Sequence, residues 1–578
     1  MRRRGIIPRS CGNNPPLPFN PLALRPDTRP KDPALAPAGG LSPTPSTGSL
    51  VPDWLPAVAL ASALATVLLI WDPQVRDLAA QAFRVELFER EGFAIWNGSW
   101  YEGHYTLTYS VLFPPLAALL GPQLVGALSA ITSAYMFDRL VRDHWGARAR
   151  WASLWFAAGA VTMLATGRVT FSLGVVFGLV ALRCLQLQRT PAAIVAAAAC
   201  ALSSPVAAVF LAGITALGAL ASGWRSANRP ALAVAAVAAV PILLLNLVFP
   251  DESRQPFSFA AFVPVLLYGG ATLYITRGQP DERRFRWVVV AYVIVTAIVW
   301  LFPNPLGNNV VRLPALFGGP LLLAILLARR PRVPHAIAVL ILATAAFWMF
   351  LAPVRDLARS AGDESTRAGY YHGLQDWLRA HGGKEARVEV PTTLNTWEAA
   401  YLAPEFQLAR GWLGQLDRAR NSVFYGDRLT KERYGEWLER NGVRYVALPD
   451  APLQQSARTE KRLILSEPRY LERRWTSKHW RVYEIANPRP LVRSTDGKAT
   501  LHSLRPESFT MRVERPGTFT VLARSSPYWE ISRGSGCVGD RSGWTTLRVR
   551  RPGTVRAEIG FSVGGALRSA ARSNSTCH

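Results

Sequence analysis

Hydrophobic residues are unevenly distributed along this chain of 578 residues. Residues 54–353 consist of long apolar stretches separated by short polar joints, whereas residues 1–53 and 354–578 are mainly polar. An apolar stretch of about 20 residues is long enough, as a helix, to cross the hydrocarbon core of a bilayer. The pattern therefore predicts a polytopic α-helical membrane domain between two polar regions.

About eleven apolar segments are long enough, or nearly so, to span a membrane. The fifth of them is short, and a further apolar piece over residues 111–120 is too short to span and suits a re-entrant position. We expect the spans at residues 54–70, 122–141, 149–166, 169–187, 191–204, 206–222, 231–249, 257–276, 287–302, 313–328 and 333–352.

The formal net charge of +26 comes mostly from Arg, and the distribution of Arg predicts the orientation of the chain. Basic joints stay on the cytoplasmic side of a membrane, which places the Pro-rich and Arg-rich tail 1–53, predicted to be disordered, inside the cell. An odd number of spans then places residues 354–578 outside. The Arg residues form no single patch, which argues against nucleic acid as a partner. The basic joints are residues 142–150, 183–189, 224–229, 277–286 and 329–332.

The polar segment after the first span, residues 72–121, carries the candidate catalytic carboxylates. Asp77 lies near the start of an amphipathic helical pattern, with Gln81 and Arg84 further along the same face. Asp77 is a candidate general base or an ordinary first-turn acid favoured by the helix dipole. Asp72 is either a second candidate or the N-cap of this helix, and Glu86 falls among apolar positions on the helical wheel.

The same outer loop continues with aromatic and polar residues that suit substrate binding. Glu102, His104 and Tyr105 lie in a segment rich in Gly, Trp and Tyr. Such aromatic residues stack on sugar rings, or they form the belt that membrane proteins place at the interface. No second His or Cys stands at the spacing of a zinc site, so no metal site is assigned. A carboxylate-bound divalent cation stays an open alternative.

Three Arg residues at the predicted outer ends of spans are candidate ligands for a phosphate. Arg168 follows one span and precedes the next with only Gly167 between, and Arg254 and Arg312 occupy comparable positions. An Arg at this depth needs a carboxylate or a lipid phosphate as its counter-ion, unless its side chain extends to the aqueous interface.

The outer C-terminal region follows a soluble pattern. Residues 354–487 alternate helical and strand-like segments and predict an α/β domain, with a helix at 366–381, strands at 386–390 and 443–448, and a hairpin at 473–484. After Pro488 only short strands and turns are expected, so residues 488–578 predict a small β-sandwich-like module. Cys537 and Cys577 share this oxidising compartment and are expected to form a disulfide, whereas Cys11, Cys184 and Cys200 are not.

The chain resembles the GT-C superfamily of integral membrane glycosyltransferases in its many spans, large first outer loop and outer C-terminal region. The first-loop pattern is Asp77-x-x-x-Gln81, Gly92-Phe93, Trp96, Gly103 and Phe113-Pro114, and many relatives have His where Gln81 stands. The C-terminal region is similar to that of YfhO-type membrane proteins. That similarity is carried by residues 441–446, 483–489 and 527–529.

The resemblance implies transfer of a sugar from a polyprenyl-phosphate donor to a glycan, lipid or protein acceptor on the outer face of a bacterial plasma membrane. Asp77 would then be the base, the outer-loop Arg residues would hold the phosphate, and the C-terminal modules would bind acceptor glycan. Two alternatives remain open from the sequence. One is a non-catalytic scaffold or glycolipid-binding protein of the cell envelope, and the other is a transporter, although no internal repeat is visible.

Overall fold

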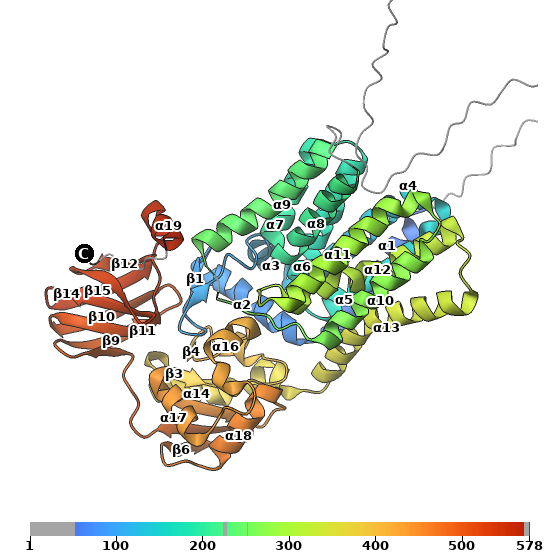
Figure 1. Cartoon of the computed structure of the whole chain (residues 1–578). Helices are drawn as coiled ribbons and strands as arrows, with labels where there is room; N and C mark the ends of the chain where they lie inside the picture. The colour runs from blue at the N-terminus through green and yellow to red at the C-terminus, as the bar shows by residue number, and fades with distance from the viewer. Residues whose placement is uncertain (1–51, 223–227, 251, 572–576, 578) are drawn as a thin grey trace, which may run out of the picture.

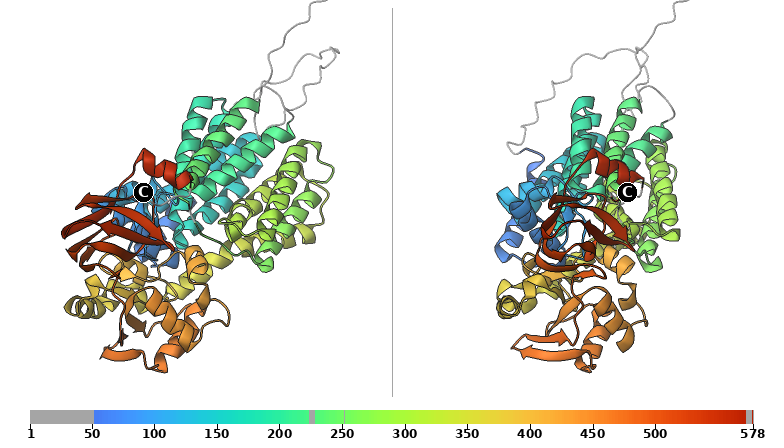
Figure 2. Two further views of the ribbon diagram at one scale, coloured as in Figure 1. Left: turned by 60° about the vertical axis from the view of Figure 1, so that its left-hand side comes forward. Right: turned by 90° about the vertical axis from the view of Figure 1, so that its left-hand side faces the viewer.

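The computed structural model describes residues 52–222, 228–250, 252–571 and 577. A bundle of helices is followed by two sheet-rich units, which both lie toward one end of the bundle (Figures 1 and 2). The predicted tail falls almost entirely outside the described residues, and so does Cys11.

Helices occupy all eleven predicted span positions within the described chain. Six of them are long and apolar enough to cross a membrane, or up to seven if the bent pair α1–α2 counts as one span. Three shorter apolar helices are α7, α8 and α10. The structure therefore supports a membrane-like helical region, but a count of eleven crossings is not confirmed. The helices are α1 (Leu55–Trp71), α4 (Pro122–Trp145), α5 (Arg150–Ala165), α6 (Val169–Gln186), α7 (Thr190–Ser203), α8 (Pro205–Ala221), α9 (Arg229–Val248), α10 (Phe259–Ile275), α11 (Arg283–Leu301), α12 (Arg312–Arg329) and α13 (His335–Ser360).

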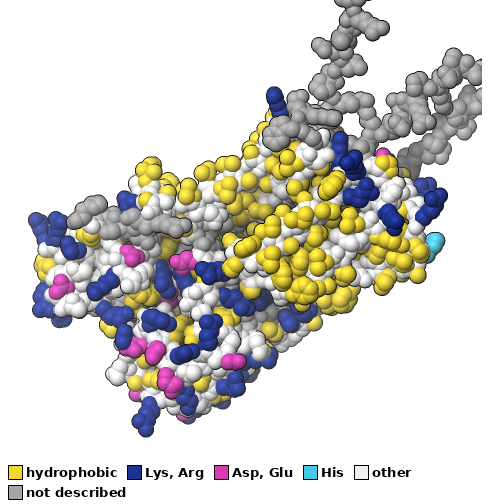
Figure 3. Space-filling model, viewed as in Figure 1, with side chains coloured by type: hydrophobic (Ala, Val, Ile, Leu, Met, Phe, Trp, Pro, Cys, Tyr) yellow, Lys and Arg dark blue, Asp and Glu magenta, His cyan; other side chains and the backbone are white. Residues whose placement is uncertain are grey.

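The basic joints between these helices gather at one end of the bundle. Arg142 at the end of α4 pairs with Asp53 before α1, at 2.8 Å. Arg183 of α6 pairs with Asp143, and Arg329 of α12 pairs with Glu282 before α11, at 2.9 Å. Figure 3 shows Lys and Arg side chains around this end and a broad apolar surface along the helices. The alternation of basic and non-basic joints thus corresponds to two ends of one helical bundle.

The opposite end carries the loop that follows α1, residues 72–121. Helix α1 ends at Asp72, which adopts a left-handed conformation with φ of 48°, and α2 (Arg76–Glu91) leaves at an angle of 77° to α1. The side of α2 that faces inward is lined with small and apolar residues, so the helix lies buried at the end of the bundle. The loop returns through a short hairpin, β1 (Trp96–Asn97) and β2 (His104–Tyr105), and the short helix α3 (Phe113–Leu120).

An α/β unit packs directly against α2. Its mixed sheet has the strand order β4-β3-β5-β7-β6, in which β3 pairs in parallel with β4 and β5 while β7 is antiparallel to β5. Residues of α2 and of this unit belong to one apolar core. The strands are β3 (Arg387–Glu389), β4 (Gln407–Leu408), β5 (Val443–Pro449), β6 (Leu471–Thr476) and β7 (Trp480–Ile485), and the principal helices are α14 (His372–Ala380), α16 (Gly414–Arg420), α17 (Lys431–Arg440) and α18 (Arg458–Leu465).

The last unit is a sandwich of two four-stranded sheets with orders β12-β15-β10-β9 and β13-β14-β11-β8. Alternate side chains of β10, β11 and β14 form the core between the sheets. One expectation was wrong, because a helix, α19 (Val563–Ala570), follows the last strand. The strands are β8 (Val492–Ser494), β9 (Lys498–Leu504), β10 (Ser508–Arg515), β11 (Gly517–Arg524), β12 (Trp529–Arg533), β13 (Gly536–Arg541), β14 (Trp544–Val549) and β15 (Gly553–Ile559).

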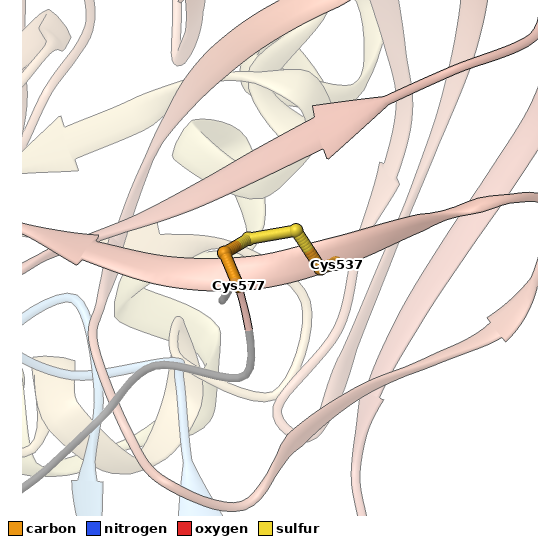
Figure 4. The surroundings of a disulfide bond; sticks show 2 residues. All are labelled: Cys537 and Cys577. Atoms are coloured by element: carbon orange, nitrogen blue, oxygen red, sulfur yellow. A yellow bond between two sulfur atoms is a disulfide. The ribbon is translucent and has the colours of Figure 1, made fainter.

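Cys537 and Cys577 form a disulfide in the structure (Figure 4). Cys537 belongs to β13, and the bond closes a segment of 40 positions that includes β14, β15 and α19. The backbone N–H of Cys577 also donates to the Val538 carbonyl, at 3.2 Å. The chain after α19 is therefore fastened to the edge strand of the sandwich.

Candidate functional site

Asp77 lies in the first turn of α2, against the connection between α5 and α6. Its carboxylate accepts from Nε of Arg168 at 3.2 Å, and about a quarter of each side chain remains exposed. Gly167 makes this approach possible. Its φ is +72°, and a Cβ there would stand only 2.4 Å from the backbone nitrogen of Leu78. The pair therefore depends on a glycine immediately before the arginine.

The predicted face of α2 forms one wall of the site. The amide nitrogen of Gln81 donates to the Tyr109 hydroxyl at 3.3 Å, while its buried Oε1 has no hydrogen-bond partner among the described residues. The guanidinium of Arg84 lies over the Tyr109 ring, 3.6 Å from its centroid. Trp412 of the α/β unit adds a second aromatic ring to this wall, 6.5 Å from that of Tyr109, and its Nε1 donates to the Arg76 carbonyl at 3.1 Å.

Two further charged residues complete the group around Asp77. Arg312, in the first turn of α12, interacts electrostatically with Asp77 and Arg168. Asp356, near the end of α13, interacts with the same two residues. Asp356 also pairs with Arg355 at 3.6 Å. Guanidinium groups therefore outnumber the two carboxylates in this half-buried group, and the excess of positive charge favours binding of an anion.

An apolar cavity of about 300 Å³ lies inside the bundle next to this charged group. Its walls come from α4, α6, α8, α10, α11 and α12, and nearly all the lining surface is apolar. Phe171 links the two features, because its ring lines the cavity and lies 5.3 Å from the Arg312 guanidinium. A charged site at the α2 end of the bundle therefore adjoins an apolar space within it.

The other two candidate acids lie apart from the Asp77–Arg168 pair. The helical wheel placed Glu86 on the buried side of α2, but in the structure Glu86 is not buried. Its side chain is 44% exposed and pairs with Arg90 at 3.8 Å. Asp72 is not the N-cap of α2 either, since Val75 holds that position. Asp72 ends α1 and accepts from Gln123 at 3.0 Å, in an exposed position.

The three loop residues expected to bind substrate have structural contacts, and two of them join the loop to the C-terminal units. Glu102 is buried and pairs with Arg524 of β11 at 3.3 Å. The Tyr105 hydroxyl shares a hydrogen bond with Ser526 at 3.1 Å. His104 is buried, its ring parallel to that of Trp100 at 5.8 Å, and burial lowers its pKa to about 3. These contacts account for Glu102 and Tyr105 as structural links between units, and for His104 as a buried residue packed within its own loop.

Arg254 is exposed in the connection between α9 and α10, where its backbone N–H donates to the Gln415 carbonyl. Among the described residues no group of three or more His, Cys, Asp or Glu side chains is placed to hold a metal ion. Sequence reasoning missed Tyr109, Asp356 and Trp412. A signal existed for Asp356, an acid among Arg355 and Arg359 just beyond the last apolar segment, but none marked Trp412, over 330 positions from α2.

No protein-family model matches the sequence, and a search of curated proteins found no match. Among solved structures, the arabinofuranosyltransferase AftD from Mycobacteria is similar, with 14% identity and a TM-score of 0.46 over 89% of this chain and 57% of that one. ArnT from Cupriavidus metallidurans has 15% identity and a TM-score of 0.38, over 74% of this chain and 97% of ArnT. The archaeal oligosaccharyltransferase AglB from Archaeoglobus fulgidus has 13% identity and a TM-score of 0.33, over 68% of this chain and 69% of AglB.

An arabinofuranosyltransferase and an oligosaccharyltransferase are thus among the solved structures to which this chain is similar. The chain spans less than two thirds of the length of AftD. At identities of 13 to 15% and TM-scores below 0.5, the similarity concerns the arrangement of the chain and carries no argument about its activity.

Proposed function

We propose that this protein is a membrane glycosyltransferase that takes a sugar from a polyprenyl-phosphate donor on the outer face of the bacterial plasma membrane. The observation that carries the proposal is the junction between the charged group around Asp77 and the apolar cavity. A donor of this class has an anionic phosphate joined to a long hydrocarbon chain, and the site offers a cationic group beside an apolar space in the same order.

In this proposal Arg168 and Arg312 bind the phosphate and Asp77 acts as the base. The donor phosphate competes for the guanidinium of Arg168 and so releases the Asp77 carboxylate from their ion pair. Asp77 then accepts the proton of an acceptor hydroxyl, while the oxygen of that hydroxyl forms a bond to the anomeric carbon of the sugar. The bond from that carbon to the phosphate oxygen breaks, and the polyprenyl phosphate leaves with the electron pair, stabilised by both Arg residues.

The acceptor would approach from the α/β unit, which covers the other side of α2. A cavity of about 510 Å³ opens there, lined by Arg458, Lys461 and Arg462 of α18. Gln454, which follows a residue of its wall, accepts from Arg76 at 3.4 Å, so the cavity lies one contact away from the residue before Asp77. These three cations outnumber the one carboxylate of the lining, Asp450, so the cavity favours an acceptor that carries phosphate or carboxylate groups.

The test is the substitution Asp77→Asn, which keeps the size of the side chain and removes its basicity. Transfer from a polyprenyl-phosphate sugar by the reconstituted protein should fall by about two to four orders of magnitude. Asp72→Asn is the matched control, because Asp72 is an acid in the same loop outside the site, and its activity should stay within about twofold. Full transfer by Asp77→Asn would refute the base assignment.

The glycolipid-binding alternative is separated by a binding measurement on the same variants. Arg312→Ala should weaken binding of polyprenyl phosphate whether the protein is a glycosyltransferase or a glycolipid-binding protein, because both would bind the phosphate. If Asp77→Asn and the wild type support the same envelope glycans in a deletion strain while Arg312→Ala does not, the protein binds a lipid phosphate without catalysis.

A further inference from the structure

Helix α19 lies beside the outer end of a membrane-type helix. The Ser569 hydroxyl donates to the carbonyl of Val248, the last residue of α9, at 2.7 Å. Tyr528 of the sandwich donates to the same carbonyl at 2.9 Å. Gly565 lets α19 approach the sandwich closely, since a Cβ at this position would lie 2.7 Å from the Tyr528 ring. In Figures 1 and 2 the helix projects from the sandwich toward the bundle.

The opposite side of this segment is apolar and exposed. Phe561, Val563 and Leu567 are 62%, 73% and 67% exposed, values that are high for residues of this type in a folded soluble module. Figure 3 shows apolar side chains where the helix projects from the sandwich. On α9, Leu243 and Leu247 are also more than half exposed. Because α19 contacts the end of α9, the two exposed apolar faces adjoin one another.

The helix is fastened to the sandwich at both ends, so its exposed face is held in place. At its start the Ser562 hydroxyl caps the helix by accepting from Gly565 N–H, at 3.1 Å, and it also donates to Glu530 at 3.2 Å. Near its end Arg568 donates to the Pro527 carbonyl at 2.8 Å. Beyond the helix the disulfide between Cys577 and Cys537 returns the chain to β13.

We infer that α19 is an interfacial membrane helix that inserts Phe561, Val563 and Leu567 among the lipids of the outer leaflet. The surface it extends is the apolar side of α9, which itself meets lipid in a membrane-spanning bundle. A short helix with one apolar side and one polar side is the form that lies in the plane of a bilayer surface. The anchor would hold the β-sandwich against the membrane, whether or not the protein transfers a sugar.

The experiment measures the depth of a fluorophore on α19 in a bilayer. Leu567→Cys is made in the full chain after replacement of Cys11, Cys184 and Cys200, with the disulfide left intact, and is labelled with NBD. The protein is reconstituted into vesicles of phosphatidylethanolamine and phosphatidylglycerol, with and without lipids that carry a doxyl quencher on the acyl chain. Thr500→Cys is the matched control, because Thr500 is exposed on β9 at the far edge of its sheet.

The label at position 567 should lose at least half of its fluorescence to the acyl-chain quencher, while the label at position 500 should lose almost none. Equal quenching at the two positions would overturn the inference. A label at 567 that is shielded from water-soluble iodide but not quenched by lipid would also overturn it, because a second protein copy would then cover the helix.

A second variant tests the apolar face itself. Val563→Asp places a charge at a position that is 73% exposed, so it leaves the attachment of α19 to the sandwich in place. With the label at position 567, this variant in the same vesicles should lose clearly less fluorescence to the acyl-chain quencher than the protein that keeps Val563. Unchanged quenching would overturn the insertion of this face into lipid.

Discussion

Gly167→Ala is the sharpest test of how the candidate site is held together. The substitution introduces a Cβ that would stand 2.4 Å from the Leu78 nitrogen, at a residue whose φ is +72°. The left-handed conformation costs a non-glycine residue about 1–2 kcal/mol, and relief of such a contact costs about 1–3 kcal/mol more. We therefore expect a loss of about 2–5 kcal/mol in stability and a displacement of the loop that carries Arg168.

Gly121→Ala is a matched control, because Gly121 has a φ of +82° and no atom within 4 Å of its would-be Cβ. It lies between α3 and α4, and its ψ of 143° places it in a conformation that other residues rarely adopt, so it should lose only the conformational part, about 1–3 kcal/mol. The difference between the two variants isolates the contact between the α5–α6 connection and α2.

The assay combines thermal unfolding of the purified protein in detergent with binding of polyprenyl phosphate. Gly167→Ala should unfold at a lower temperature than Gly121→Ala and bind the lipid phosphate more weakly, because a displacement of about 1 Å is enough to cost some 100-fold in function. If both variants unfolded and bound alike, the close approach of Gly167 to α2 would not position Arg168, and the reasoning would be refuted.

Three further predictions concern other parts of the molecule. Cys537→Ser should destabilise the β-sandwich by about 4 kcal/mol, because the disulfide no longer restricts the unfolded chain over a loop of this length. Denaturant unfolding followed by near-ultraviolet circular dichroism measures this loss. Cys577→Ser should lose the same amount, and a stability equal to that of the wild type would contradict the prediction. Burial raises the pKa of Glu507 to about 7 from an ordinary 4.5, so its contribution to stability is complete below pH 4.5 and is lost as the pH rises through 7. Glu507→Gln should flatten that part of the stability profile, and an unaltered profile would assign it to other groups. A phosphatase reporter fused after Asp363 should be active and one fused after Arg286 inactive; the reverse would invert the proposed orientation.

Local patterns predicted the elements well, because apolar length and strand alternation are recorded in neighbouring residues. All eleven predicted span positions carry helices within the described chain. The strand expected at 443–448 is β5, and the hairpin expected at 473–484 is β6 and β7. The face of α2 that joins Asp77, Gln81 and Arg84 was also predicted, since it follows from helical periodicity alone.

The roles of the loop residues could not be predicted, because they depend on partners far along the chain. Glu102 was read as a substrate ligand, yet its counter-ion Arg524 lies 422 positions later. An exposed acid in a loop and a buried acid paired with a distant Arg look identical in sequence. The error on Glu86 has a different cause. The side of the wheel on which Glu86 falls is buried at Leu78 and Ala79, in the first turn of α2, but that side is no longer covered at Glu86, two turns further on.

The contacts between the first outer loop and the sandwich have a consequence for biosynthesis. The N–H groups of Ile95 and Trp96 donate to Glu507, and the Trp96 ring packs against Trp529 at 6.5 Å. Residues synthesised early thus contact partners that lie more than 400 positions later in the chain and are synthesised last. Long-range pairing of this kind closes late in folding. The loop that carries Asp77 would therefore reach its final form only after the C-terminal module has been synthesised and folded, and chains released before that point would lack a complete site.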